Sequence, residues 1–252
     1  APDPRSSIQS RILRHSGPVV SAAFSPNGTM LATGCWDQKV YIWKAHSGEV
    51  VRILDGHKES PIIKVAFSPD GSMLVTVYQD DTTCIWNTGS WELLNTLGSV
   101  ASVEFSYDGS RLAVGFEDGA VSIVDTRSWK SLHTLHEHGT SITRAPDGAM
   151  QTHAALVALS PDGAMLAAVF HEDDTAHIWN ADSGKLLFEL SDHTDPIISV
   201  AFSPDGAKLA VGFESGAVSI YNTRSWELSG KLTNNAASIT SLAFSPDGSK
   251  LA

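Results

Sequence analysis

The stretch VAFSPDG, residues 65–71, decides the fold, because close copies of its last five residues recur along the chain. The copies read FSPNG, FSPDG, FSYDG, LSPDG, FSPDG and FSPDG, and they begin at residues 24, 67, 105, 159, 202 and 244. Most neighbouring copies lie about 40 residues apart, a period typical of stacked structural repeats. The chain is therefore predicted to be an array of similar units.

Each unit reads as short strands separated by turns. In the second unit, the segments IIKVAF, SMLVTVY, TTCIW and WELLNTL are rich in β-branched and aromatic residues. The Asp-Gly and Asn-Gly steps favour tight hairpins, and no window carries apolar residues at a sustained helical spacing. The pattern predicts an all-β protein with about four antiparallel strands in each unit. Such a meander cannot bury both of its faces alone, so the units are expected to stack radially as a β-propeller.

The units also resemble WD repeats. The first unit contains ATGCWDQKVYIWK (residues 32–44), and the second contains DGH (residues 55–57), VAFSPDG and YQDDTTCIWN (residues 78–87). The resemblance extends from about residue 8 to residue 252 and implies a single WD-repeat propeller domain over residues 1–252. It places five complete blades near residues 18–55, 61–98, 99–136, 153–191 and 196–233, and a closing blade at residues 238–252 plus 8–14. Six blades are predicted, with an incomplete seven-bladed ring as the alternative.

In WD repeats a His, a turn Asp and a strand Trp tie each blade together through hydrogen bonds. The resemblance assigns this structural role to His15, Asp37, Trp43, His57, Asp80, Trp86, His138, Asp173 (or Asp174), Trp179 and His193. The family places a Ser or Thr two residues before the Asp, where this chain has Cys35 and Tyr78 in the first two blades. We therefore expect apolar packing to replace that hydrogen bond.

The residue just before the turn Asp projects from one rim of a WD propeller, where partners of the family dock. In this chain the rim residues are Trp36, Gln79, Glu117, Glu172 (or His171) and Glu214. A tryptophan among carboxylates suits a basic peptide, through cation–π contact and ion pairing. The alternative is an ordinary solvated acidic face.

The composition of the chain excludes several classes of partner and activity. The net charge of −11 argues against nucleic acid as a partner, and no apolar run reaches the length of a membrane helix. Two cysteines are too few for a disulfide framework, which favours the cytoplasm, with the nucleus as an alternative. No nucleophile elbow, phosphate loop or metalloprotease motif is present, so neither an enzyme nor a cofactor is predicted.

The sequence therefore predicts a non-enzymatic interaction scaffold, or a regulatory or sensor propeller, that binds a protein or peptide. This propeller is either an independent protein or part of a larger polypeptide or complex. The alternative is a small-ligand or metal-binding propeller that uses the central channel or the region of His136 and His138, where alternate residues of a strand share one face.

Overall fold

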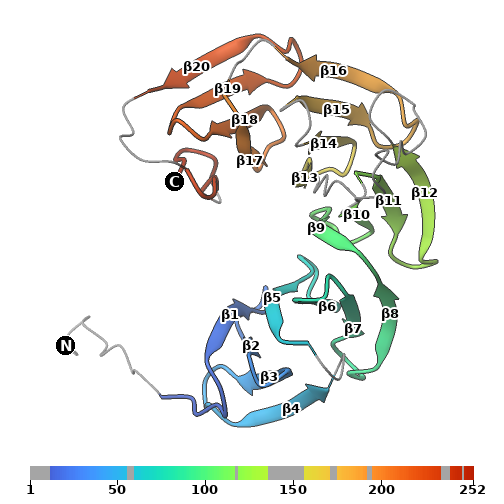
Figure 1. The fold of residues 1–252 in the computed structure, drawn as a ribbon, viewed down its shortest axis with the longest axis vertical. Helices are drawn as coiled ribbons and strands as arrows, with labels where there is room; N and C mark the ends of the chain where they lie inside the picture. Colours follow the sequence, from blue (N-terminus) through green and yellow to red (C-terminus); the bar gives the residue numbers. More distant parts are fainter. Residues whose placement is uncertain are drawn as a thin grey trace, which may run out of the picture. The chain divides into compact units, whose positions relative to one another are not determined.

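The computed structural model describes residues 12–55, 60–116, 119–135, 156–170, 175–191, 195–233, 239–245 and 247–252. Within these ranges the chain forms five four-stranded antiparallel sheets, and each sheet follows the chain order of its strands (Figure 1). No helix that is long and apolar enough to cross a membrane occurs in these ranges. The prediction of an all-β protein built from four-stranded antiparallel units is confirmed.

The chain divides into two compact units, residues 1–67 with 71–96 and residues 68–70 with 97–252. The first unit contains two sheets. Their strands are β1 (Val19–Phe24), β2 (Met30–Cys35), β3 (Lys39–Lys44) and β4 (Val50–Asp55), then β5 (Ile62–Phe67), β6 (Met73–Tyr78), β7 (Thr83–Asn87) and β8 (Leu93–Leu97). Within this unit β1 and β2 lie against β5, so the two sheets meet through their early strands.

The second unit contains three sheets. Their strands are β9 (Val100–Phe105), β10 (Arg111–Phe116), β11 (Val121–Asp125) and β12 (Lys130–Leu135), then β13 (Leu156–Leu159), β14 (Met165–Val169), β15 (Ala176–Asn180) and β16 (Leu186–Leu190), and finally β17 (Ile197–Phe202), β18 (Lys208–Phe213), β19 (Val218–Asn222) and β20 (Leu228–Leu232). The first strand of the middle sheet, β13, lies against both β9 and β17. The first strands of the three sheets therefore lie side by side, as radial stacking requires.

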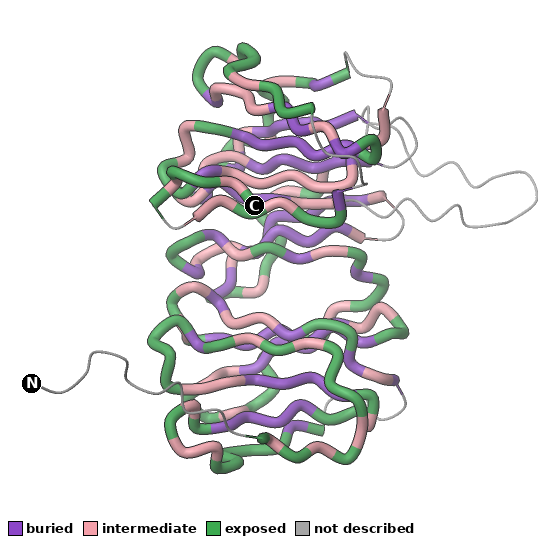
Figure 2. The backbone as a smooth tube through the Cα atoms, turned by 90° about the vertical axis from the view of Figure 1, so that its left-hand side faces the viewer, coloured by how far each residue is buried: buried purple, intermediate pink, exposed green. Residues whose placement is uncertain are grey.

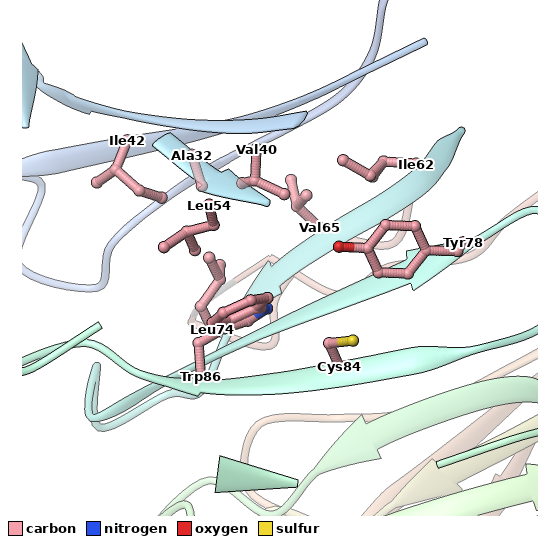
Figure 3. Close-up of a cluster of buried hydrophobic side chains, with 10 residues drawn as sticks. All are labelled: Ala32, Val40, Ile42, Leu54, Ile62, Val65, Leu74, Tyr78, Cys84 and Trp86. Atoms are coloured by element: carbon pink, nitrogen blue, oxygen red, sulfur yellow. The ribbon is translucent and has the colours of Figure 1, made fainter. Parts of the chain in front are cut away.

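The core lies between neighbouring sheets of the same unit. In the first unit, Ala32, Val40 and Ile42 of one sheet face Leu74 and Trp86 of the next across a continuous apolar layer (Figure 3). Because the middle strands have a neighbour on both sides, β6 is buried at all six positions, whereas β4 is exposed at five of six. Figure 2 shows the same contrast, with buried residues in the strand interiors and exposed residues in the turns. Burial is thus set by the position of a strand within its sheet.

The recurring FSPDG phrase forms the turn between the first and second strands. In its second copy, the Ser68 hydroxyl donates to Asp70 at 2.6 Å, and in its third copy Ser106 donates to Asp108 at 2.8 Å and accepts from the Arg111 N–H at 2.9 Å. The glycine that ends the phrase has a left-handed backbone, with φ between 68° and 75° in all six copies, a conformation that favours glycine. The phrase recurs because three of its residues have a task in the turn: the Ser bonds to the Asp, and the Gly adopts the left-handed backbone.

The first copy differs from the others in having Asn27 in place of the aspartate. The Asn27 Oδ1 accepts from the Ser25 hydroxyl at 2.8 Å and from the N–H and hydroxyl of Thr29 at 3.0 and 2.7 Å. Equivalent donors bind the aspartates of the other copies. In the last copy, the Ser245 hydroxyl is the main contact that lowers the pKa of Asp247, which falls to about 2. Asn27→Asp is therefore expected to raise the melting temperature at pH 7 by about 1–2 °C, since the three bonds become charge-assisted.

The pH dependence of this gain follows from its sign. A carboxylate whose pKa is lower in the folded than in the unfolded state stabilises the fold above the unfolded pKa, and this stabilisation is lost as the pH falls toward the folded pKa. Thermal melts at pH 7 and at about pH 2 should therefore show the gain only at the higher pH. The reverse change, Asp205→Asn, should lower the melting temperature at pH 7. A gain for Asn27→Asp that persists at pH 2 would contradict the explanation.

The two ends of the described chain are less regular than the five sheets. Ile12, Leu13 and Arg14 belong to no strand, and residues 8–11 of the predicted closing blade lie outside the described residues. At the other end, Phe244 and Leu251 form a single antiparallel bridge, and Ile239 packs on Ala210 and Val218 of the fifth sheet. The pairing of the two ends, the single closed domain and the number of blades stay predictions.

Candidate functional site

Three of the predicted rim residues are described, and they occupy tight turns between the second and third strands. Trp36 donates its backbone N–H to the Pro18 carbonyl at 3.0 Å, and Gln79 and Glu214 make the same bond to the proline before their own first strand, at 2.9 Å each. Trp36 is 54% exposed, and Gln79 and Glu214 are also exposed. Each turn thus fixes its backbone and leaves the rim side chain in solvent. Glu117, His171 and Glu172 lie outside the described residues.

In four of the five sheets, the residue two places after the rim position is described, and it adopts a left-handed backbone. It is Gln38 in the first sheet and Asp81 in the second, with φ of 71° and 62°, and glycine follows the rim positions of the third and fifth sheets. The N–H of Gln38 also closes the turn onto the Cys35 carbonyl at 3.2 Å. A non-glycine residue in this conformation needs support from its surroundings, so the first two turns are held by more than their own backbone.

In the first sheet that support comes from Asp37, the residue that follows Trp36 in the turn. The Asp37 carboxylate accepts hydrogen bonds from the Ser16 hydroxyl, from the Tyr41 hydroxyl at 2.6 Å and from the Lys39 N–H at 3.2 Å. Burial pushes the pKa of Asp37 upward, but the Ser16 and Tyr41 bonds outweigh it, so the pKa is lowered and Asp37 is ionised at neutral pH. For the neighbouring thiol of Cys35, burial and then the charge of Asp37 raise the pKa to about 11.

A second set of contacts lies deeper in the same sheet. The indole N–H of Trp43 donates to the Thr33 hydroxyl at 2.8 Å, and His15 Nε2 lies 2.8 Å from the same oxygen. The His15 ring also packs edge-on against Tyr41 and Trp43, with ring centroids 5.2 and 5.0 Å apart. His15 and Trp43 therefore both contact Thr33, whereas Asp37 binds Ser16 and Tyr41.

This arrangement corrects the expected position of the hydroxyl. The resemblance to WD repeats placed the hydroxyl-bearing residue at the positions of Cys35 and Tyr78. Packing was therefore expected to replace the hydrogen bond there. The hydroxyl instead comes from Thr33 and, in the second sheet, from Thr76, which accepts from the Trp86 indole N–H at 3.0 Å. Residues two apart on a strand share a face, so Thr33 lies on the same side of β2 as Cys35. Thr33 is also two residues closer along β2 to Leu31, the residue that pairs with Trp43. The threonine common to LATGCWD and LVTVYQD was the signal that could have identified it.

The other sheets replace these bonds with different contacts. At the register of Thr33 the third, fourth and fifth sheets have Val114, Ala168 and Val211. In the fourth sheet, Trp179 stacks on His177 with centroids 5.4 Å apart and meets Phe170 edge-on at 6.0 Å. The predicted Trp179 is thus held by aromatic packing. His57, His138, Asp173, Asp174 and His193 lie outside the described residues.

In the second and fifth sheets, the residue before the proline is a further contributor that the resemblance to WD repeats did not indicate. Ser60 accepts the N–H of Asp80 at 3.0 Å, and Asp195 accepts the N–H of Ser215 at 3.3 Å through both carboxylate oxygens. Asp80 in turn accepts from the Thr82 N–H at 3.2 Å. In the fifth sheet, where Ser215 stands in place of the turn aspartate, Asp195 therefore supplies a carboxylate from the opposite side of the turn.

The predicted metal alternative receives no candidate from the described part of the chain, which contains no group of three potential ligands. His136 and His138 lie outside it. His133, the first histidine of the SLHTLHEHG segment, places Nε2 2.8 Å from the carbonyl oxygen of Asp182 in the neighbouring sheet of the second unit. This histidine therefore joins two sheets, and the metal site stays a prediction.

Comparison with known proteins places these features in a family. The family model described as WD domain, G-beta repeat matches residues 7–44, 48–87, 184–222 and 226–252, which is more than half of the chain. A second family model, the Vps8 beta-propeller, matches residues 72–191.

Three relatives align over about 60 residues each. An uncharacterized WD repeat-containing protein of Synechocystis is 43% identical over 22% of this chain, and a probable serine/threonine-protein kinase, PkwA, of Thermomonospora curvata is 37% identical over 23%. The human angio-associated migratory cell protein is 40% identical over 24%. The alignments cover 16%, 8% and 14% of these relatives, so the similarity is to their repeats and not to whole proteins.

The repeats, the Asp-centred turns and the tryptophans bonded to threonine agree with the family match. WD-repeat propellers are generally non-enzymatic scaffolds that bind other proteins, and a shared scaffold does not by itself define the partner. From these observations we conclude that the chain belongs to the WD40-repeat β-propeller family.

Proposed function

We propose that this protein binds basic segments of a partner at its exposed rim turns, at Trp36 in the first unit and, independently, at the acidic residues of the equivalent turns in the second unit. The observation that carries the proposal is that Trp36 is 54% exposed while its backbone is held by the Pro18 carbonyl and by the turn below it. A large aromatic side chain in solvent on a fixed backbone loses little conformational freedom on binding, which favours recognition.

Charge determines the kind of partner that we propose. The chain has a net charge of −11. Asp37, the residue after Trp36, is ionised, and Glu214 is exposed at the corresponding turn of the fifth sheet. Glu117 and Glu172 complete the proposed acidic set. Lys and Arg side chains suit this combination, because the aromatic face and the carboxylates both attract a cation. A cytoplasmic location belongs to the same proposal and is supported by Cys35 and Cys84, which are both free and buried.

The test uses a fluorescein-labelled heptapeptide of alternating lysine and glycine, with a glutamate version as the charge control. Fluorescence anisotropy should show binding of the lysine peptide only. Trp36→Ala should weaken it about tenfold, because the aromatic contact is central to the site. In a Trp36→Ala background, Glu214→Lys should weaken the remaining binding about threefold at low salt and less at high salt, because a rim charge is screened.

The matched control is Phe24→Ala, which removes another exposed aromatic ring, 64% exposed, at the end of β1 in the same unit. This variant should bind the lysine peptide like the wild type. If Trp36→Ala binds as tightly as the wild type, or if the glutamate peptide binds equally well, the proposal is wrong. Circular dichroism of each variant checks that the fold is retained.

A further inference from the structure

The fourth strands of the three sheets in the second unit are β12, β16 and β20, and each pairs with one neighbouring strand only (Figure 1). Most residues of these strands are exposed. They include large apolar residues, each 43–53% exposed: Leu132, Leu186, Leu187, Leu228 and Leu232. Single apolar residues are ordinary on protein surfaces, whereas a contiguous apolar patch marks a binding surface.

A β-bulge exposes one leucine on each of the first two strands. On β12 the register passes from Ser131 to His133, so Leu132 has no paired residue on β11. On β16 the register passes from Leu186 to Phe188, so Leu187 has no paired residue on β15. A bulge adds a residue to a strand and changes the direction of its side chain. Leu132 and Leu187 therefore occupy equivalent positions on the outside of neighbouring sheets.

Side-chain contacts join the three strands into one surface. His133 places Nε2 2.8 Å from the carbonyl oxygen of Asp182, in the turn before β16. At the next junction, Phe188 stacks on Trp226 in the turn before β20, with ring centroids 5.1 Å apart and an angle of 7° between the planes. Within two residues of these contacts lie four of the exposed leucines, which we call the leucine strip: Leu132, Leu186, Leu187 and Leu228.

Cations accompany the leucine strip. Exposed basic residues lie on the three strands and in the turns that precede them: Arg127, Lys130, Lys185, Arg224 and Lys231. None of the three lysines forms an ion pair with another described residue. This part of the surface is therefore rich in free positive charge, although the whole chain has a net charge of −11.

Most carboxylates near the strip are engaged. Asp125 accepts from the N–H and the hydroxyl of Ser128, and Asp182 forms an ion pair with Arg111. Glu189 Oε2 lies 3.8 Å from Nε2 of His177, and Glu227 is a single further carboxylate at the start of β20. The cations of the strip therefore outnumber the carboxylates that could neutralise them.

The fourth strands of the first unit lack this combination. On β8, Leu93 and Leu94 are 49% and 41% exposed, but Glu92 precedes the strand and the strand itself carries no cation. On β4, Arg52 is accompanied by Asp55. Exposed leucines and unpaired cations thus coincide on the second unit.

From this coincidence we infer that the leucine strip binds an acidic segment of a partner protein, one whose carboxylates are interspersed with apolar side chains. The lysines and arginines attract the carboxylates and steer the encounter. The leucines bury the apolar side chains of the segment and remove their surface from water. This segment is opposite in charge to the one proposed for Trp36, so the two surfaces bind different partners or different parts of one partner.

A fluorescein-labelled peptide, Glu-Leu-Asp-Asp-Leu-Phe-Glu-Glu-Leu-amide, tests this inference. One counterpart has Asn and Gln in place of Asp and Glu, and a second has Ser in place of Leu and Phe. Fluorescence anisotropy with the 252-residue chain should show binding of the acidic peptide. Each counterpart should bind at least about fivefold more weakly, because each loses one of the two contributions.

Variants locate the binding site. Leu187→Ser should weaken binding of the acidic peptide about fivefold, because it removes an apolar contact from the middle of the strip. Lys185→Glu should weaken it about threefold at low salt and less at high salt, because exposed charges are screened. The matched control is Leu94→Ser, which removes a leucine of nearly the same exposure from β8 and should bind like the wild type. Circular dichroism checks that each variant is folded.

The other results overturn the inference. Equal binding of the Asn and Gln counterpart would show that the cations do not select the segment. Wild-type affinity in Leu187→Ser, or loss of binding in Trp36→Ala, would place the peptide elsewhere. Binding to vesicles of phosphatidylserine and phosphatidylcholine without binding of the peptide would assign the strip to a membrane. Absence of all binding would refute the strip as a site and leave the lysine-peptide experiment at Trp36 unaffected.

Discussion

Gly34→Ala is expected to destabilise the protein by about 3 kcal/mol, near the upper end of what overpacking of a core costs. A Cβ atom on Gly34 would lie 2.5 Å from Cγ2 of Ile62 and 3.1 Å from Cγ1 of Val65, both in the neighbouring sheet of the first unit. The Gly34 backbone is not left-handed, so conformational strain does not contribute. Without the clash, alanine would restrict the unfolded chain and stabilise the protein. Chemical denaturation measures the free energy of unfolding.

A double-mutant cycle with Ile62→Ala identifies the cause. Ile62→Ala alone should cost about 3 kcal/mol, because it leaves a cavity in a fully buried site. In Gly34→Ala/Ile62→Ala the new methyl group occupies part of that space. The free energy of unfolding lost by the double variant should therefore be about 2 kcal/mol smaller than the sum of the two single losses. Strictly additive losses would mean that the two residues do not compete for the same volume.

Gly212→Ala is the matched control, because Gly212 pairs with Val218 as Gly34 pairs with Val40. Its Cβ would lie 3.0 Å from Cδ1 of Leu242 and 3.2 Å from Cγ2 of Ile239. Both belong to the C-terminal segment, which is held to the fifth sheet by apolar packing and by the bond from the Leu242 N–H to Ser199, and which can yield more easily than a strand, so the expected loss is about 1 kcal/mol. Equal losses for the two variants would contradict the role of Ile62.

The second large effect is expected for Thr33→Val. This substitution keeps the shape of the side chain but removes the oxygen that accepts the Trp43 indole N–H and lies 2.8 Å from His15 Nε2. Trp43 is only 5% exposed, so its donor would be left without a partner in the core. We expect a loss of about 2 kcal/mol in the free energy of unfolding, the usual cost of a buried unsatisfied donor. Denaturation of Thr33→Val, Trp43→Phe and the double variant should give a coupling of about 1 kcal/mol.

Thr83→Val provides the control in the same unit. Thr83 is fully buried, and within the described residues its hydroxyl has no hydrogen-bond partner. The same chemical change should therefore leave the stability unchanged or raise it, because a buried hydroxyl without a partner only costs desolvation. If Thr33→Val and Thr83→Val have the same effect, the loss at Thr33 does not come from its hydrogen bonds.

The local architecture could be read from the sequence, because the interactions that set it are short in range. Strands appear where β-branched and aromatic residues run between turn residues, and the first strands begin near the residues expected for all five sheets. The FSPDG turn joins Ser, Asp and Gly within five residues, so the turn can be predicted from this short segment alone. The exposed position of Trp36 followed from its place just before the turn aspartate.

Contacts across strands and between sheets were decided only by the tertiary structure. Thr33 meets Trp43 because the register pairs Leu31 with Trp43, and Asp195 caps the turn of Ser215 from 20 residues away. Trp226 adopts a left-handed backbone with φ of 58° and stacks on Phe188 of the preceding sheet, with ring centroids 5.1 Å apart.

The contacts between neighbouring sheets likewise depend on how those sheets stack. A one-residue change in register would turn a side chain to the other face of its strand and so change the side chains that it meets. The sequence alone therefore determined the repeated unit, its strands and its turns. The three-dimensional packing determined which side chains from different units meet, because those contacts depend on the distance between sheets and not on separation along the chain.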